Sequence, residues 1–486
     1  MDMTSRRTFL KWAALAAPSA TPFGSLAAWG IAPDTTSGKA ATPVRAWRTS
    51  DKARCERIDA PTWRNGASAG SGAGSAAIQL HLDQPCQELL GFGAALTDAS
   101  CYLLQQMPAS ARGALLKECF GADGLRMSIA RTTIGSSDYS RDPYTYDDTA
   151  QPDPDLTHFS IEHDRQYILP VLHETQQVNP EVFYFSSPWS PPAWMKAGDS
   201  LLGGSMRSRY FAPYAEYFVK FLQGYAADGV HIRAVTIQNE IDTDQGGRMP
   251  QCMWGQEYEI QFVKEYLGPA LQKNSLDTKI WILDHNYNLW GRVADEFEDP
   301  GLSQYVDGVA WHGYYGSPAA MTRVHNMFPL KNAYWTEGGS DVTAPDYTTD
   351  WAKWSGTFAG ILNNCARCIV SWNLVLDEHG KPNIGPFNCG GLLTLHSQTQ
   401  QLTRSGMYWA LAHYSKFMQR GAQVFTTTGD LPEIDHIAVQ NPDGSRVLVL
   451  TNRGQEQDHD RRVQCVLQDK TLELQLPPNS VTTLIL

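Results

Sequence analysis

Short apolar runs alternate with longer amphipathic segments through the middle of this chain. In the longer segments the apolar residues recur every three or four positions, which predicts helices, whereas the short runs are typical of buried strands. Helices are expected at residues 210–225, 256–271 and 406–417. The apolar runs occur eight times, at residues 89–96, 125–134, 182–187, 232–238, 279–283, 306–312, 333–336 and 368–376.

Eight strand–helix units over roughly 320 residues predict an α/β fold, the (β/α)8 TIM barrel, rather than an open doubly wound sheet. No Gly-x-Gly-x-x-Gly motif follows the first strand, which disfavours dinucleotide binding. After residue 420 the pattern becomes all strand and predicts a β-sandwich. The strand-like stretches at 45–82 lack partners of their own, so we expect them to complete this sandwich. Its later strands are expected at residues 434–439, 446–450, 462–467, 471–476 and 480–486.

The first residues carry a pattern that is typical of an export signal. Arg6 and Arg7 form a twin-arginine motif, Ser-Arg-Arg-Thr-Phe-Leu-Lys, and a modest apolar run follows it. We therefore expect a periplasmic or secreted protein; a chance arginine pair is the alternative, and the cleavage site stays open. No later run of 18 or more apolar residues occurs, which predicts no stable membrane insertion. The predicted parts are a signal region (1–41), N-terminal sandwich strands (42–87), the catalytic barrel (88–418) and the C-terminal sandwich (419–486).

Composition narrows the possible partners. The formal net charge of −12 argues against nucleic acid as a partner. The 15 tryptophans suit a protein that stacks aromatic rings on sugars, although most tryptophans are core residues. The nine cysteines are an odd number, so at least one is unpaired within the chain, and the lone pair Cys365 and Cys368 is weak evidence for a metal. The oligomeric state stays open.

The carboxyl ends of barrel strands usually hold the active site, so residues there are the candidates for chemistry. Glu240 follows the fourth predicted strand, and Glu337 follows the seventh. Strands three apart face each other across the mouth of an eight-stranded barrel. Two facing carboxylates suit glycoside cleavage, and a retaining enzyme needs them about 5–5.5 Å apart. We expect the charge of Glu337 to raise the pKa of Glu240. The alternative is that each glutamate forms an ordinary surface salt bridge.

Ordered motifs along the chain are similar to those of a known family. GFGAALTDAS begins at Gly91, SSPWSPPAWMK begins at Ser186, EYFVKFLQGYAADGVHIRAVTIQNE ends at Glu240, and TEGGS surrounds Glu337. HYSKFMQRGAQ and NPDGSRVLVLTNR, both after residue 412, match as well. With these motifs, residues 88–486 resemble glycoside hydrolase family 30, and within it the glucosylceramidase branch.

The resemblance implies a double displacement with Glu337 as the nucleophile and Glu240 as the general acid/base. It also implies six further site residues. Four of them have a structural alternative: a helix cap for Asp98, packing for Trp189 and Trp372, and a core position for His312. The implied roles are binding of the sugar 2-hydroxyl by Asn239, binding of other hydroxyls by Asp98, a sugar pocket lined by Trp189 and Trp372, orientation of the nucleophile by Tyr314, and positioning of the carboxylates by His312.

The sequence departs from the animal enzymes of this family at the rim of the site. Ser371 stands where they have an aspartate, Gly313 replaces an aromatic residue, and the loop at 377–393 differs. The first interpretation is an exported retaining β-glycosidase that is β-glucosidase or glucosylceramidase-like. An endo-β-1,6-glucanase, β-xylosidase or β-fucosidase of the same family is the alternative. An inactive carbohydrate-binding protein is the alternative from another class.

The expected partner is a β-linked glucoside or glucan, with exo or endo cleavage left open. Two carboxylates suffice for a double displacement, so no metal and no organic cofactor are expected. Because Glu240 has to be protonated to act as an acid, an acidic pH optimum is expected.

Overall fold

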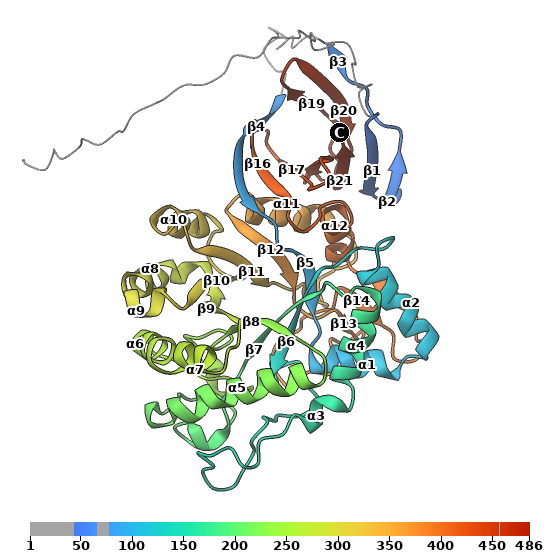
Figure 1. The fold of residues 1–486 in the computed structure, drawn as a ribbon. Coiled ribbons are helices and arrows are strands. Elements are labelled where there is room, and N and C mark those ends of the chain that lie inside the picture. The colour runs from blue at the N-terminus through green and yellow to red at the C-terminus, as the bar shows by residue number, and fades with distance from the viewer. Residues whose placement is uncertain (1–42, 66–76, 456) are drawn as a thin grey trace, which may run out of the picture. The chain divides into compact units, whose positions relative to one another are not determined.

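Eight parallel strands close into a barrel in the computed structural model, which describes residues 43–65, 77–455 and 457–486. Strands that are consecutive around the barrel pair with each other, and β12 closes the ring by pairing with β5 (Figure 1). The predicted TIM barrel is confirmed, whereas the predicted signal region lies outside the described residues. The barrel strands are β5 (Gly91–Ala95), β6 (Ile129–Ile134), β7 (Phe183–Pro188), β8 (Ile232–Thr236), β9 (Lys279–Asn286), β10 (Val306–His312), β11 (Asn332–Glu337) and β12 (Ala366–Ser371).

Helices connect the barrel strands and cover the outside of the barrel (Figure 1). The helix expected at 210–225 is α5, whose apolar face is buried from Phe211 to Tyr225. After it the chain turns at Gly229, which has a φ of 80°. The helices are α1 (Asp98–Gln106), α2 (Ala109–Phe120), α3 (Glu162–Arg165), α4 (Ile168–Val178), α5 (Phe211–Ala227), α6 (Gln256–Gln261), α7 (Gly268–Lys273), α8 (Trp290–Glu298), α9 (Pro300–Ser303), α10 (Ala319–Met327), α11 (Trp351–Leu362) and α12 (Gly406–Ser415).

The helix expected at 256–271 is interrupted. A π-helical stretch, Phe262–Leu267, separates α6 from α7 and keeps Phe262, Val263 and Leu267 buried. Pro269, at the start of α7, has no N–H to donate to a carbonyl in the preceding turn, so regular α-helical bonding cannot continue through it. The apolar spacing predicted the helical face correctly but carried no sign of this change in winding.

Strands from both ends of the chain form the second domain, as the sequence predicts. The N-terminal β1 pairs antiparallel with the C-terminal β21, and β4 pairs with β16 and β19. The strand β16, with the sequence QVFTTT, was not among the expected elements. The sheet order is β2, β1, β21, β18, β17, β16, β4, β19, β20, β3. Its strands are β1 (Arg45–Ser50), β2 (Ala53–Ile58), β3 (Arg64–Asn65), β4 (Ala77–Glu88), β16 (Gln423–Thr428), β17 (Ile434–Gln440), β18 (Arg446–Asn452), β19 (Arg461–Leu467), β20 (Lys470–Leu476) and β21 (Ser480–Ile485).

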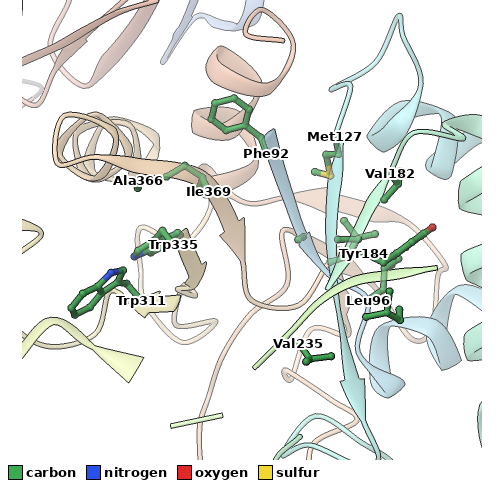
Figure 2. Packing of buried hydrophobic residues seen from close by; sticks show 14 of the residues in the cluster. Phe92, Leu96, Met127, Val182, Tyr184, Val235, Trp311, Trp335, Ala366 and Ile369 are labelled. Carbon is green, nitrogen blue, oxygen red and sulfur yellow. The ribbon is translucent and has the colours of Figure 1, made fainter. Parts of the chain in front are cut away.

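One hydrophobic cluster extends from the barrel into one face of this sheet. Phe92, Tyr184 and Trp335 belong to its barrel part, and Figure 2 shows side chains of this cluster on several barrel strands. Val449 and Val481 of the sheet belong to the same cluster. The other face of the sheet buries a separate cluster that includes Leu448, Leu450 and Leu484. The domains therefore share a core instead of meeting across a solvated gap.

A small sheet follows the last barrel strand, and the cysteines are unpaired. Val375–Leu376 (β13), Leu393–Leu395 (β14) and Leu402–Arg404 (β15) form a three-stranded sheet after the last barrel strand. All nine cysteines are free thiols, including the Cys365 and Cys368 pair. Within the described ranges, no helix is both long enough and apolar enough to cross a membrane.

Candidate active site

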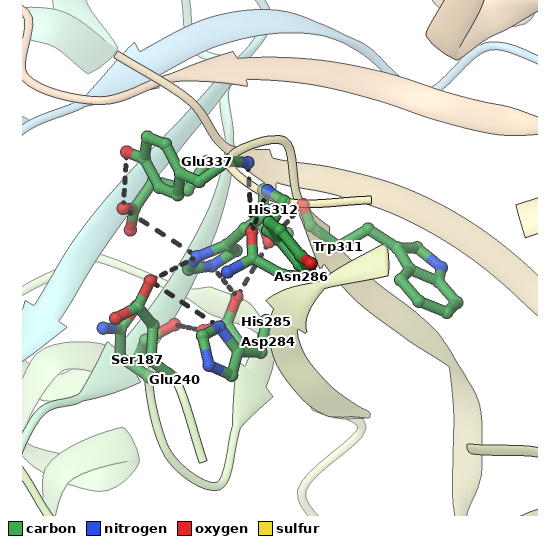
Figure 3. A network of polar contacts seen from close by, with 12 residues as sticks. Ser187, Glu240, Asp284, His285, Asn286, Trp311, His312 and Glu337 are labelled. Atoms are coloured by element: carbon green, nitrogen blue, oxygen red, sulfur yellow. Dashed lines mark hydrogen bonds and ion pairs between the residues drawn. The ribbon is translucent and has the colours of Figure 1, made fainter. Parts of the chain in front are cut away.

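The two candidate carboxylates approach each other at the carboxyl ends of the barrel strands. Glu337 is the last residue of β11, and Glu240 lies just beyond the end of β8. His312, the last residue of β10, lies between them: its Nδ1 is 3.4 Å from Glu240 Oε1 and 3.9 Å from Glu337 Oε1 (Figure 3). One imidazole nitrogen therefore reaches both carboxylates, so they can act on the same bond of a bound substrate.

A buried arginine holds the groups around Glu337. Arg131, on β6, forms an ion pair with Glu337 and donates hydrogen bonds to Asp284 Oδ2 at 2.7 Å and Asn239 Oδ1 at 2.8 Å. Its guanidinium carbon lies 4.9 Å from the ring centre of Trp189. A fully buried charge persists only when it is paired and hydrogen-bonded, and Arg131 meets both conditions.

The charges of this network shift the pKa values of its members. Burial would raise the pKa of Asp284, but the charge of Arg131 and the hydrogen bond from His312 hold it well below its usual range. Burial would lower the pKa of His312, but the charge of Glu337 and the hydrogen bonds to Asp284 and Glu240 raise it to about 9. His312 is therefore a cation at neutral pH, held between three carboxylates.

The pKa of Glu240 differs from the sequence-based expectation. Burial is the largest influence and raises it, but the hydrogen bond and charge of His312, the charge of His285 and a hydrogen bond from Gln245 outweigh burial. The pKa of Glu240 consequently lies below its ordinary value. The expected rise caused by Glu337 is wrong for the free protein, because that expectation did not include the histidine cation between the two carboxylates.

Three residues at or just beyond these strand ends have a strained backbone conformation. Glu240, Asp284 and Asn373 have φ values of 51°, 47° and 49°, in the left-handed region that side chains other than glycine rarely adopt. Such residues cost on the order of 1–3 kcal/mol each and cluster at functional sites. Hydrogen bonds hold them in place: the Glu240 N–H donates to the Asp284 carbonyl at 2.9 Å, and Thr97 donates to Asn373 Oδ1 at 2.9 Å.

The carboxylates open into a cavity of about 450 Å³. The rings of Trp189 and Trp372 stack at 5.1 Å in its wall, and the Tyr314 hydroxyl donates to Glu337 Oε1 at 2.9 Å. Of the residues proposed from sequence, His312 is buried behind the carboxylates and does not line the cavity. The lining residues are Asp138, Trp189, Asn239, Glu240, Thr243, Gln245, Met249, His285, Asn286, Tyr314, Glu337, Trp372, Phe387 and Cys389.

The structure does not bring Asp98 to this cavity. Its carboxylate is buried and accepts hydrogen bonds from the Tyr167 hydroxyl at 2.6 Å and from the Arg141 N–H at 3.0 Å. The cap of α1 is Thr97, which accepts from the Ser100 N–H, so Asp98 is the first helical residue and not the cap. Asp98 is therefore not among the residues that line this cavity, and its contact with sugar hydroxyls stays a prediction.

Asp138, in the loop after β6, lines the cavity instead. It is 4% exposed, and its Oδ1 is buried without a hydrogen-bond partner among the described residues. Burial, then the charges of Glu337 and Glu240, raise the pKa of Asp138 well above its usual value. Because buried polar atoms are nearly always satisfied, an unpaired carboxyl oxygen on a residue that lines a cavity makes Asp138 a candidate for a contact with a ligand hydroxyl.

Sequence reasoning missed Asp138, Asp284 and His285 for one reason. Residues at the carboxyl ends of the second and fifth predicted strands were not considered as site candidates. The end of the second strand runs into Ile-Gly-Ser-Ser-Asp, which ends at Asp138, and the end of the fifth runs into Ile-Leu-Asp-His, which ends at His285. Arg131, an arginine in the middle of the second predicted strand, was a further signal, because a buried charge needs partners. Two groups of side chains in the described part of the chain could hold a metal ion: Glu240 with His285 and His312, and Asp147 with Asp153 and His158.

Known proteins share both domains. Residues 89–418 match the glycosyl hydrolase family 30 TIM-barrel domain, and residues 421–484 match the glycosyl hydrolase family 30 beta sandwich domain. An endo-1,6-beta-D-glucanase of Neurospora crassa is 34% identical over 386 residues, covering 76% of this chain and 79% of that protein. The lysosomal acid glucosylceramidase of Mus musculus is 30% identical over 400 residues, 78% of each chain. A solved endo-beta1,6-glucanase is 30% identical, with a TM-score of 0.82, covering 91% of this chain and 99% of that one. The chain therefore belongs to glycosyl hydrolase family 30 and is a hydrolase of glycosides.

Proposed function

We propose that this protein is a retaining endo-β-1,6-glucanase. The observation that carries the proposal is that a relative at 34% identity and a solved structure at a TM-score of 0.82 both bear this name, whereas the mouse glucosylceramidase is 30% identical. The order of the two interpretations drawn from the sequence is therefore reversed, with glucosylceramidase-like activity now second.

In this proposal Glu337 attacks the anomeric carbon and forms a covalent glycosyl-enzyme. Arg131 pairs with one oxygen of Glu337, and the Tyr314 hydroxyl donates to the other, so the carboxylate is held in one orientation. Arg131 also occupies Asn239 Oδ1, which leaves the amide N–H groups of Asn239 to donate to the sugar 2-hydroxyl. A hydrogen bond at that hydroxyl strengthens in the transition state.

Glu240 supplies the proton to the leaving oxygen. In the free protein the proton is held on His312, whose Nδ1 lies 3.4 Å from Glu240 Oε1. A bound glucan displaces water from the cavity, which favours the neutral form of Glu240 and returns the proton to its carboxyl group. In the second step Glu240 accepts a proton from the water that hydrolyses the glycosyl-enzyme.

Exposed aromatic residues around the cavity favour a polymeric substrate over a single sugar. Tyr314, Tyr315 and Phe387 are 45%, 69% and 40% exposed, and the Tyr315 N–H donates to Asn286 in the cavity wall. Exposed aromatic rings stack on the apolar faces of sugars. Glucose units that continue beyond the cavity would therefore find contacts on these rings.

The test is digestion of a linear β-1,6-glucan, with early products separated by size and followed by proton NMR. The proposal predicts β-1,6-linked oligosaccharides before free glucose, first as the β anomer, and no products from Glu337→Gln. Release of glucose alone from chain ends would refute endo cleavage. Faster hydrolysis of glucosylceramide than of the glucan would restore the glucosylceramidase-like interpretation.

Export through the Arg6 and Arg7 motif is a separate proposal that rests on sequence alone. Replacing both arginines with lysine should retain the protein in the cytoplasm of a bacterial host, as fractionation and immunoblotting would show. Unchanged export of this variant would refute it.

A further inference from the structure

Two histidines face Glu240 inside the cavity wall. Nδ1 of His285, on β9, is 3.6 Å from Glu240 Oε1, and Nδ1 of His312, on β10, is 3.4 Å from the same oxygen (Figure 3). One ligand atom from each of the three residues lies within 4.8 Å of the other two. Two imidazole nitrogens and one carboxylate oxygen thus converge on one point from three different strand ends.

A carboxylate orients each imidazole from behind. His285 Nε2 lies 2.8 Å from Asp242 Oδ1, and His312 Nε2 lies 3.0 Å from Asp284 Oδ1. With the Nε2 hydrogens given to these carboxylates, the Nδ1 atoms are the ones that face Glu240. This carboxylate–histidine arrangement is the one that positions imidazole ligands around metal ions in proteins.

A second and independent observation points to a ligand here. Nδ1 of His285 is buried and makes no hydrogen bond in the part of the chain that the structure describes. The whole residue is 8% exposed. A buried ring nitrogen without a partner costs free energy, which a bound cation would recover. The charge around the point still favours a cation, because the four carboxylates Glu240, Asp242, Asp284 and Glu337 outnumber the two cations Arg131 and His312.

We propose that Glu240, His285 and His312 bind a divalent transition-metal ion of the Zn²⁺ or Cu²⁺ type, which inhibits the enzyme reversibly. Imidazole suits these metals, whereas Ca²⁺ and Mg²⁺ prefer oxygen ligands. The ion would occupy the Glu240 carboxylate, so this group could no longer donate a proton to the leaving oxygen. The inhibition part of the proposal rests on the proposed function; the binding site does not.

The test is calorimetric titration of the chelator-treated full-length protein with Zn²⁺, repeated with Cu²⁺ and followed by electron paramagnetic resonance for nitrogen ligands. We expect His285→Asn to weaken Zn²⁺ binding at least tenfold, and Asp242→Asn to weaken it by about 10–100-fold through loss of imidazole orientation. His158→Asn is the matched control, because it removes a histidine from the other candidate cluster and should leave this binding unchanged.

Three results would overturn the site. These are no Zn²⁺ binding by the wild-type protein, binding by both His285→Asn and Asp242→Asn that is as tight as in the wild type, or loss of binding in His158→Asn. Activity measured at the same Zn²⁺ concentrations separates the two proposals. A protein that binds Zn²⁺ through His285 but does not cleave the glucan keeps the site and loses the proposed function. A protein that cleaves the glucan without binding Zn²⁺ supports the proposed function and refutes the metal site.

Discussion

His413 is expected to make the protein lose stability as the pH falls below neutral. It lies on α12, fully buried between the barrel and the sandwich, with Nδ1 2.8 Å from the Thr483 hydroxyl and Nε2 2.8 Å from the Thr49 hydroxyl. Burial, then the charges of Arg48 and Lys416, lower the pKa of His413 to about 3. The folded protein therefore keeps this imidazole neutral where an unfolded chain would protonate it.

The size of the effect follows from that pKa. An unfolded histidine has a pKa of about 6.5, so between pH 6.5 and pH 3 the unfolded state binds one more proton than the folded state. The contribution of the neutral His413 to the free energy of unfolding is therefore fully present above pH 6.5. It is lost as the pH falls, by up to about 1.4 kcal/mol per pH unit. Between pH 7 and pH 5 the loss from His413 amounts to about 2 kcal/mol.

The assay is urea unfolding of the wild-type protein and of His413→Gln at pH 7 and pH 5, monitored by tryptophan fluorescence. The glutamine variant does not titrate, so its unfolding free energy should fall by about 2 kcal/mol less than that of the wild type over this interval. The variant is expected to be less stable at pH 7, because it loses a buried hydrogen bond. Equal decreases in the two proteins would show that His413 is not the source of the pH dependence.

Three further predictions concern the active site. Glu240→Gln should lower kcat/KM on β-1,6-glucan by about 10²–10⁴. It should leave kcat/KM for a dinitrophenyl β-glucoside nearly unchanged, because that leaving group needs no proton. Equal losses on both substrates would contradict the acid role of Glu240. Arg131→Met should cost about 3–5 kcal/mol of unfolding free energy in urea titrations, because it leaves Asp284 and Glu337 buried without their cation, and a loss below about 1 kcal/mol would show that they do not depend on it. Asp138→Ala should raise KM for the glucan about tenfold or more while the melting temperature stays close to that of the wild type, and an unchanged KM would exclude a sugar contact.

The barrel could be predicted because its strands are continuous apolar runs. The run at 306–312 has the same limits as β10, and Glu337 ends β11 as its place in the sequence indicated. The strand β16 was missed because QVFTTT ends in three threonines and has few apolar residues to mark it. The π-helical stretch after α6 was missed because its apolar residues keep a helical spacing.

The candidate site was predicted less completely than the fold. Sequence spacing identified Glu240 and Glu337, and the structure brings them together through His312. The sequence could not show that Asp98 binds Tyr167 while Asp138 lines the cavity, because both are aspartates near strand ends. The direction of the Glu240 pKa depends on the distances to charged neighbours, which a sequence does not contain.

In the proposed mechanism Glu337 attacks the sugar, and this step can be tested by trapping the covalent intermediate. The protein is incubated with a 2-deoxy-2-fluoro-β-glucosyl fluoride or its β-1,6-linked disaccharide analogue, then examined by intact-mass spectrometry and peptide mapping. We expect one added sugar unit, on the peptide that holds Glu337, and no label in Glu337→Gln. A label on any other residue, or cleavage of the glucan with inversion at the anomeric carbon, would contradict it.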